Sequence, residues 1–321
     1  MVTECETGDN GMTLYELSPY GVIGAVTPST NPSETLICNA IGMLAAGNAI
    51  FFSVHPGAKK LSRWLVSELN KIVADAIGIN NLIVTIAEPS IEAAQEMMVH
   101  PDIPLLVVTG GPGVVHQALC SGKKVIGAGA GNRPAFVDET ANIRQAAQDI
   151  VMGASFDNNI LCIAEKSVVA VRSIADELIE EMKKAGAVLI EREDQIQKLL
   201  DITLQKNCTP SRKYVGRNAA VILRDAGIEV DGDPRLIIMK TDKHHPFATI
   251  EMLMPILPIV TVENFEDGLA TCLFLEAGLH HTATMHSLNL ERLNKMARAM
   301  KTSIFVKNGP SYAGLGYNGE G

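Results

Sequence analysis

The stretch "GVIGAVTPSTNPSETLICNAIGMLAAGNAIFFSVHP", residues 21–56, decides the fold of this chain. Residues 21–28 form an apolar run that predicts a buried strand, and residues 31–48 predict a helix. A second apolar run at 49–54 predicts another buried strand. A strand, a helix and a strand in this order are typical of a parallel sheet covered by helices on both faces.

The same alternation continues towards the carboxyl end. Further strands are predicted at 81–87, 104–110 and 167–171. Further helices are predicted at 58–78, 90–100, 143–156 and 174–190. The first of these helices carries an apolar stripe formed by Leu61, Leu65, Leu69 and Ile72. The sequence therefore predicts an α/β fold built on parallel sheets.

Composition and charge narrow the class of protein. With 321 residues, 47% of them hydrophobic, the chain is long enough for two domains with sizeable cores. The net charge is −9 and no long basic block occurs, which argues against nucleic-acid binding and against attraction to an anionic membrane. No apolar run reaches the roughly 18 residues of a membrane span. We therefore expect neither a nucleic-acid partner nor a membrane.

Cysteine and histidine spacing argues against a metal site and against a disulfide framework. The 6 cysteines are scattered and form no Cys-x-x-Cys pair: Cys5, Cys38, Cys120, Cys162, Cys208 and Cys272. Such usage is typical of a reducing compartment. Histidines of the second half match no ligand pattern and are expected in structural or loop positions: His244, His245, His280, His281 and His286. Cys38 and Cys272 lie in apolar helical runs and are expected in the core.

The motif "TPSTNPSE", residues 27–34, marks the start of the first helix. Asn31 stands at the N-cap, Pro32 at the first helical position, and Glu34 completes a capping box. One interpretation is simply a helix start. The other is functional, because a capping asparagine keeps its NH₂ group free to donate to a developing oxyanion.

The motif "VVTGGPGVVHQAL", residues 107–119, joins a predicted strand to a helix through a Gly-Gly-Pro-Gly turn. Such a turn presents backbone N–H groups at the positive end of a helix, which suits a pyrophosphate. A tight strand-to-helix turn without a ligand is the alternative.

Cys162 lies in "GASFDNNILCIAEKSVV", residues 153–169. A single cysteine is more often a small buried apolar residue than a nucleophile. Two features favour a nucleophile here: the polar residues "DNN" shortly before Cys162, and a position that opens a helical turn. Backbone N–H groups at the start of such a turn stabilise a thiolate.

Taken together, these segments resemble the aldehyde dehydrogenase superfamily, and its CoA-acylating branch most closely. That branch includes the acetaldehyde and propionaldehyde dehydrogenases of ethanolamine- and propanediol-utilisation microcompartments. The resemblance covers nearly the whole chain, and it rests on residues 21–56 together with the segments "VVTGGPGVV", "KKVIGAGAGNRPAFVDETA", "SFDNNILCIAEK", "EMLMPILPIV" and "HHTATMHS".

The resemblance implies a Rossmann-type cofactor domain followed by an α/β catalytic domain. It places an NAD(P)-binding domain at 20–126 and a catalytic domain at 127–308. Residues 1–19 would belong to an oligomerisation segment, and 309–321 would begin a truncated carboxyl-terminal one. The likeness and the glycine-rich ending both indicate a fragment of a longer protein.

The resemblance also implies a role for individual residues. Cys162 corresponds to the nucleophile, and Asn31 to the asparagine that joins the backbone N–H of that cysteine in the oxyanion hole. The remaining matches are with cofactor-binding residues: Thr27, Pro28 and Ser29 beside the nicotinamide, Gly110 and Gly111 near the pyrophosphate, and Glu251 at the nicotinamide ribose. No metal site is implied.

Three departures from the family pattern bear on the chemistry. Ala128 stands where hydrolytic relatives carry the glutamate that activates water. Ser53, His55 and Pro56 occupy the stretch in which hydrolytic relatives carry a lysine and a glutamate that bind the adenine ribose. The choice between NAD and NADP therefore stays open. Leu161 replaces the proline that usually precedes the cysteine in the acylating branch.

The implied reaction is oxidation of a short aliphatic aldehyde, with NAD as cofactor and CoA as co-substrate, through a thioester on the cysteine. Without the glutamate at Ala128, a thiol rather than water is expected to take the acyl group. The resemblance further implies a homo-oligomer and a cytoplasmic location, with a microcompartment shell as a further partner. A hydrolytic aldehyde dehydrogenase and a truncated, non-catalytic nucleotide-binding or assembly subunit are the alternatives.

Overall fold

The chain folds into two compact units, Met1–Gly129 (unit 1) and Ala130–Gly321 (unit 2). The structure is a computed structural model that describes residues 3–315; residues 1, 2 and 316–321, the outer parts of the two predicted terminal segments, lie outside the described residues. The division falls between Gly129 and Ala130 rather than between 126 and 127, because strand β7 (Lys124–Ala128) still pairs with unit 1. The predicted α/β class is confirmed.

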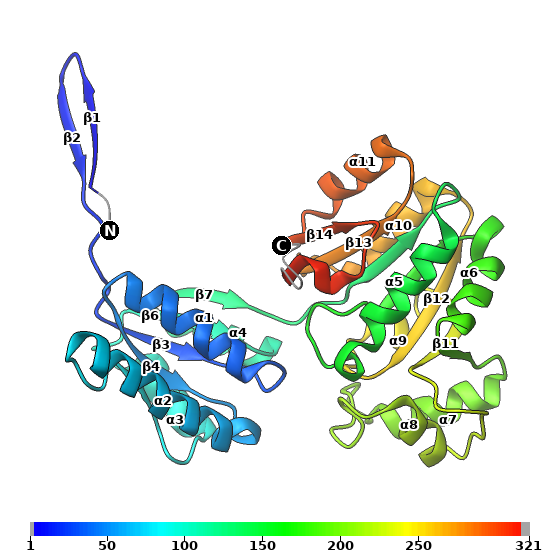
Figure 1. The fold of residues 1–321 in the computed structure, drawn as a ribbon, viewed down its shortest axis with the longest axis horizontal. Helices are drawn as coiled ribbons and strands as arrows, with labels where there is room; N and C mark the ends of the chain where they lie inside the picture. Colours follow the sequence, from blue (N-terminus) through cyan, green and yellow to red (C-terminus); the bar gives the residue numbers. More distant parts are fainter. Residues whose placement is uncertain (1–2, 316–321) are drawn as a thin grey trace. The chain divides into compact units, whose positions relative to one another are not determined.

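Unit 1 contains a hairpin and a 5-stranded parallel sheet (Figure 1). The hairpin pairs β1 (Glu4–Gly8) with β2 (Gly11–Tyr15), and each of its residues is exposed. The sheet has the order β5-β4-β3-β6-β7, with β3 (Val22–Val26), β4 (Ala49–Ser53), β5 (Ile83–Thr85) and β6 (Leu105–Thr109). Its helices are α1 (Pro32–Ala45), α2 (Lys59–Ile77), α3 (Ile91–Val99) and α4 (Pro112–Leu119), with the 3₁₀ turn η1 (Pro56–Ala58) before α2.

The strands of unit 1 bury both faces, which explains their continuous apolar runs. Because successive side chains point to opposite faces, Ile23 and Ala25 pack in the cluster formed with α1 and α2. Val26 packs in the second cluster, with α3 and α4. The sheet therefore has helices on both faces, as the alternating pattern predicted.

The order of the strands in unit 1 reverses beside β3. Helix α1 leads from β3 to β4 on one side, whereas the chain returns through α3 to β6 on the other side. In open α/β sheets, the carboxyl ends of the two strands at such a reversal border the crevice in which ligands bind. Here those two carboxyl ends are Val26 of β3 and Thr109 of β6.

Unit 2 is built on a 7-stranded parallel sheet with the order β10-β11-β12-β9-β8-β13-β14. Its strands are β8 (Pro134–Val137), β9 (Ser167–Val171), β10 (Ala187–Leu189), β11 (Leu236–Thr241), β12 (Ile256–Val262), β13 (Thr282–His286) and β14 (Ile304–Lys307). Its α-helices are α5 (Ile143–Ser155), α6 (Arg172–Lys184), α7 (Glu193–Thr203), α8 (Ala219–Asp225), α9 (Pro246–Thr249), α10 (Phe265–Glu276) and α11 (Leu290–Met300). Two 3₁₀ segments complete it, η2 (Phe156–Asn159) and η3 (Ser311–Leu315).

Both faces of the second sheet are also covered. On one face Phe136 of β8 packs against Phe265 of α10, with ring centroids 5.8 Å apart. On the other face His286 of β13 lies opposite Asp149 of α5, with Nδ1 and Oδ2 3.9 Å apart. The sheet is thus held between helices, as its uninterrupted apolar strands require.

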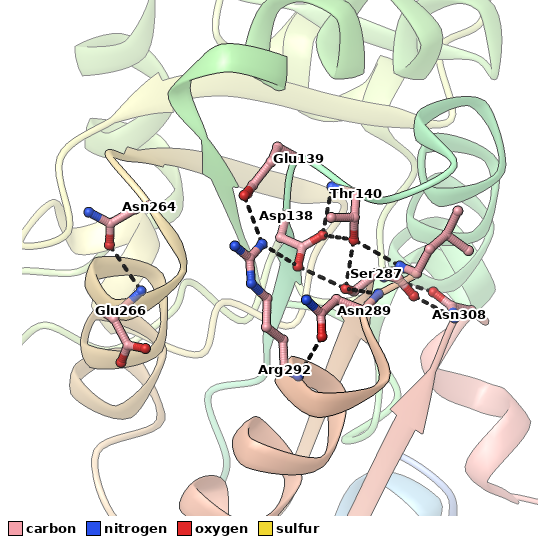
Figure 2. A network of polar contacts seen from close by, with 10 residues as sticks. Asp138, Glu139, Thr140, Asn264, Glu266, Ser287, Asn289, Arg292 and Asn308 are labelled. Carbon is pink, nitrogen blue, oxygen red and sulfur yellow. Dashed lines mark hydrogen bonds and ion pairs between the residues drawn. The ribbon is translucent and has the colours of Figure 1, made fainter.

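A polar network fills the carboxyl edge of this sheet where the strand order reverses, between β8 and β13 (Figure 2). Asp138, directly after β8, accepts hydrogen bonds from Thr140 N and Oγ1 at 2.9 and 2.6 Å. Its other oxygen accepts from Ser287 Oγ at 2.8 Å and Arg292 Nη1 at 3.1 Å. Both oxygens of the buried Asp138 carboxylate are satisfied by the chain itself, so this residue links β8 to the segment after β13 and offers no free acceptor to a ligand.

Three local expectations were wrong. The helix predicted over 174–190 ends at Lys184, and its last residues form strand β10. The buried face of α2 includes Ser62, Leu65 and Val66, whereas Ile72 is 64% exposed. Cys38 is exposed, although Cys272 is buried as expected, because Cys38 lies on the outer face of α1.

Within residues 3–315, no helix has the length and apolarity needed to cross a membrane. No group of at least 3 His, Cys, Asp or Glu side chains in this range lies close enough together to hold a metal ion.

Candidate active site

The predicted cofactor residues of unit 1 follow the carboxyl ends of three neighbouring strands. They are Thr27, Pro28 and Ser29 after β3, Ser53, His55 and Pro56 at the end of β4 and beyond it, and Gly110 and Gly111 after β6. The backbone joins these strand ends, since Thr27 N donates to Ser53 O at 3.2 Å. The topology therefore gathers all of them at one edge of the sheet, beside the reversal of strand order.

Several polar groups at this edge have no partner within the described residues, and their chemistry fits a dinucleotide. Thr27 is 2% exposed and its hydroxyl oxygen makes no hydrogen bond there. Helix α4 begins after Gly111 without a side-chain cap, so the N–H groups of its first turn are left for an acceptor. A Cβ added to Gly111 would meet nothing within 4 Å, which leaves room for a ligand against the backbone.

Asn31 stands at the N-cap of α1, as predicted, with Pro32 as the first helical residue. The predicted capping box is absent. Asn31 Oδ1 accepts from Thr30 Oγ1 at 3.1 Å, and Glu34 accepts from Ser33 Oγ at 2.9 Å. Since no residue in 3–315 accepts a hydrogen bond from Asn31 Nδ2, the amide NH₂ keeps its donors.

Cys162 lies in unit 2 in an irregular segment between η2 and β9, and it opens no helix, contrary to the sequence interpretation. Its thiol is free and half-buried. Asp157, Asn158 and Asn159, which precede it, all have left-handed backbone angles, with φ of 46°, 53° and 63°. Aspartate and asparagine tolerate this region better than other non-glycine residues, which explains the "DNN" sequence.

Hydrogen bonds from Asn159 and Lys166 hold this left-handed turn. Asn159 is 1% exposed, and its Nδ2 donates to Ala154 O at 2.7 Å and Glu165 O at 2.9 Å. Lys166 Nζ donates to Asn159 O at 2.9 Å, Asn159 Oδ1 at 2.5 Å and Leu161 O at 3.2 Å. These three acceptors match the three N–H donors of an ammonium group. The strained turn is therefore fixed from several directions.

Glu251 forms an ion pair with Arg133, which is 1% exposed. Arg133 directly precedes β8, and Glu251 lies in the segment before β12. Nε and Nη2 of Arg133 are buried and find no acceptor within the described residues. Such orphaned donors are costly unless a bound molecule or water accepts from them, so this pair marks a polar site.

Burial and neighbouring charges shift the pKa of Lys166. Burial is the largest cause that lowers the pKa of Lys166 to about 7, and the Arg133 charge lowers it further, whereas Glu251, Cys162 and Glu165 raise it. We expect the lysine to be charged at neutral pH, since its three oxygen acceptors need three donors.

His281 belongs to the same region. Burial lowers its pKa to about 4, helped by the charges of Arg133 and Lys166, so its ring is neutral at pH 7.

Glu165 is a separate buried carboxylate behind the nucleophile segment. Ser311 N and Oγ both donate to it at 2.8 Å. Burial raises the pKa of Glu165 to about 7, partly offset by its own backbone N–H and by the hydrogen bonds from Ser311. This group ties the segment before β9 to η3.

The polar residues around Cys162 all precede strands of the unit 2 sheet: Arg133 before β8, Cys162 and Lys166 before β9, Glu251 before β12 and His281 before β13. Since these strands are parallel, the residues share the amino edge of the sheet, opposite the edge occupied by the Asp138 network. Sequence reasoning missed Arg133, Lys166 and His281. The available signal was a Glu-Lys pair directly before an apolar strand, where a surface charge is unexpected.

Known proteins resemble this chain over nearly its whole length. The aldehyde dehydrogenase family model matches residues 2–316. The propanal dehydrogenase (CoA-propanoylating) of Salmonella typhimurium is 54% identical over 322 residues, which cover 100% of this chain and 69% of the relative's length.

Two solved structures are similar over 100% of this chain. Propionaldehyde dehydrogenase from Rhodopseudomonas palustris, with bound CoA and an acylated cysteine, superposes with a TM-score of 0.94 at 51% identity and is covered over 73% of its length. A propionaldehyde dehydrogenase from the fucose utilisation microcompartment of Clostridium phytofermentans gives a TM-score of 0.95 at 47% identity, also over 73% of its length.

Proposed function

The chain belongs to the aldehyde dehydrogenase family, and from that premise we propose that it oxidises a short aliphatic aldehyde, acetaldehyde or propionaldehyde, to its CoA thioester. One observation carries the proposal. Cys162 has a free, half-buried thiol, and no residue in 3–315 accepts a hydrogen bond from its backbone N–H. A nucleophile and an available oxyanion donor are thus offered by the same residue.

In the first step, Cys162 attacks the aldehyde and hydrogen-bond donors stabilise the oxyanion that forms. The Cys162 thiolate attacks the carbonyl carbon and forms the C–S bond, while the carbonyl oxygen becomes an oxyanion. We assign the Cys162 N–H and Asn31 Nδ2 as donors to that oxyanion. Loss of a hydride from the same carbon restores the carbonyl and leaves a thioester on Cys162.

NAD, when bound, supplies the acceptor for this hydride, and NADP stays open as the alternative. The residues at the carboxyl edge of unit 1 would hold it, with the first turn of α4 at the pyrophosphate and Thr27 beside the nicotinamide. Glu251, kept in place by Arg133, is assigned to the nicotinamide ribose.

The second step transfers the acyl group to CoA. Water is a poor nucleophile towards a thioester unless a base activates it, and Ala128 stands where that base would be. The thiolate of CoA is intrinsically more nucleophilic and attacks the thioester carbon, and the Cys162 thiolate leaves. Free acid is accordingly a minor product.

Product analysis tests this function. We expect acyl-CoA and reduced nicotinamide when the chain is mixed with propionaldehyde, NAD and CoA, and loss of both products in Cys162→Ser. Equal release of free acid with and without CoA would instead indicate the hydrolytic alternative. No turnover with any acceptor, despite nucleotide binding, would favour the non-catalytic subunit.

We also propose a homo-oligomer in the cytoplasm, inside a microcompartment. The exposed hairpin supports self-association, since it presents Met12, Leu14 and Tyr15 to solvent at 68%, 53% and 48% exposure. Similarity to the enzyme of a fucose utilisation microcompartment supports the location. Sedimentation of the chain and of a Met12→Ser/Leu14→Ser variant tests the first proposal, and co-fractionation with a shell tests the second.

A further inference from the structure

Lys166 is linked to the peptide bond on the amino side of the nucleophile. Its Nζ lies 3.2 Å from Leu161 O, the carbonyl of the peptide whose N–H belongs to Cys162. A trans peptide is planar, with its C=O and N–H pointing in opposite directions. A donor that fixes the Leu161 carbonyl therefore also fixes the direction of the Cys162 N–H.

Two hydrogen bonds hold the Leu161 carbonyl. Besides the bond from Lys166, Ala164 N donates to Leu161 O at 3.3 Å, which is a backbone bond within the same loop. The lysine bond is charge-assisted and comes from a side chain that is 3% exposed, so it is shielded from water. The lysine is itself anchored, since Lys166 N donates to Arg133 O at 2.9 Å at the start of β8.

The same bond polarises the amide. A cation that donates to a carbonyl oxygen draws electron density through the peptide and makes its N–H a stronger donor. Resting on the function proposed above, we infer that Lys166 is a positioning residue that aims and polarises the Cys162 N–H for the oxyanion. It acts through the Leu161–Cys162 peptide and touches no reacting atom.

Two reactions of Cys162 separate this role from a general effect on the thiol. Acylation by p-nitrophenyl acetate passes through an oxyanion, whereas alkylation by iodoacetamide does not. Both need the thiolate. The ratio of the two rates, measured on one preparation, therefore cancels the thiolate fraction and reports the oxyanion hole.

We expect Lys166→Met to lower this ratio by about tenfold, less than the ~10²–10³-fold cost of deleting an oxyanion donor, because the N–H itself remains. Lys166→Arg keeps a cationic donor, so it should lose less and provides a second variant where Lys166→Met folds poorly. Glu165→Gln is the matched control, since it changes a neighbouring buried side chain that makes no contact with Leu161 O, and it should keep the wild-type ratio.

A spectroscopic readout completes the test. Hydrogen bonding to the thioester carbonyl lowers its stretching frequency, so the infrared band of the acyl-enzyme should move upward in Lys166→Met. An unchanged ratio with an unchanged band would overturn the inference. Failure of the proposed function looks different, because wild-type protein would then be acylated no faster than Cys162→Ala.

Discussion

Arg133 is almost fully buried, and its guanidinium donates to the carboxylate of Glu251. The two residues are 118 positions apart and join the start of β8 to the segment before β12. A buried cation whose partner is removed costs far more than an exposed one, because it keeps its desolvation penalty and loses the compensating charge. The pair is therefore expected to contribute to the stability of the fold as well as to cofactor binding.

Glu251→Gln should lower the free energy of unfolding by about 3–5 kcal/mol, because it leaves Arg133 buried without a counter-charge. Urea denaturation measures this loss. Glu263→Gln is the matched control, since its ion pair with Arg172 has side chains 63% and 65% exposed, and it should change the unfolding free energy by less than about 1 kcal/mol. Similar losses in the two variants would contradict the importance of burial.

Gly153 provides a test of the packing behind the nucleophile. A Cβ at this position would collide with both carboxylate oxygens of Glu165, which Ser311 holds in place. Gly153→Ala should destabilise the chain by about 1–3 kcal/mol in urea denaturation. In the control Gly42→Ala, the new methyl group meets nothing within 4 Å, so better helix propensity should raise stability by up to about 1 kcal/mol.

Glu165 should make stability depend on pH. Its pKa rises from 4.5 in the unfolded chain to about 7 in the folded protein, so the folded state binds the proton more tightly. The stabilisation is complete below pH 4.5 and is lost as pH rises through 7, by about 3–4 kcal/mol over the whole range. Relative to wild type, Glu165→Gln should therefore gain stability between pH 5 and pH 8. Urea denaturation of both proteins at pH 5 and pH 8 measures this gain. If the difference in unfolding free energy between them were the same at both pH values, the raised pKa of Glu165 would be contradicted.

The left-handed turn before the nucleophile gives a backbone prediction. Asp157 is exposed and has φ 46° and ψ 43°, so glycine fits there without strain and a β-branched residue does not. Asp157→Gly should be close to neutral, whereas Asp157→Val should cost about 1–2 kcal/mol. Thermal melting compares the two. A valine variant as stable as the glycine variant would mean that the turn relaxes at no cost.

The fold could be predicted from sequence because its signals are local. Apolar runs separated by helix-period segments lie next to one another in the chain, and they predicted β3, α1, β4 and β9 near their observed bounds. The Gly-Gly-Pro-Gly turn likewise lies between the strand and the helix that it joins. The error at β10 has another origin, because a stop signal was present and was overlooked: Lys183 and Lys184 lie in the last turn of α6, and Gly186 follows with φ 106°.

The surroundings of Cys162 could not be predicted in this way. The ion pair of Arg133 and Glu251 depends on residues distant in sequence, and charged residues are ordinarily expected at the surface. The left-handed angles of residues 157–159 depend on the buried contacts of Asn159 and Lys166, so they could not be predicted from the sequence alone. Local sequence made Asn31 and Cys162 candidates, the family resemblance gave them their roles, and those roles stay predictions.

Ala128 is the position that should decide between CoA and water as acyl acceptor. It ends β7 and is exposed, with its carbonyl accepting from Gly110 N at 3.1 Å. Ala128→Glu restores a carboxylate where hydrolytic relatives carry one, so release of free acid in the absence of CoA should rise by about 10²-fold, the lower range for general-base catalysis. Acid release from propionaldehyde and NAD measures this gain.

Ile126→Glu is the control for the added charge. Ile126 is 58% exposed and points to the same face of β7, about 7 Å earlier along the strand, because side chains alternate along a strand. A carboxylate there adds the same charge to the same face of β7, two residues before the position at which hydrolytic relatives carry the base. If both variants released acid equally, a general charge effect would explain the gain. If neither did, the lack of a carboxylate at Ala128 would not be what protects the thioester from water.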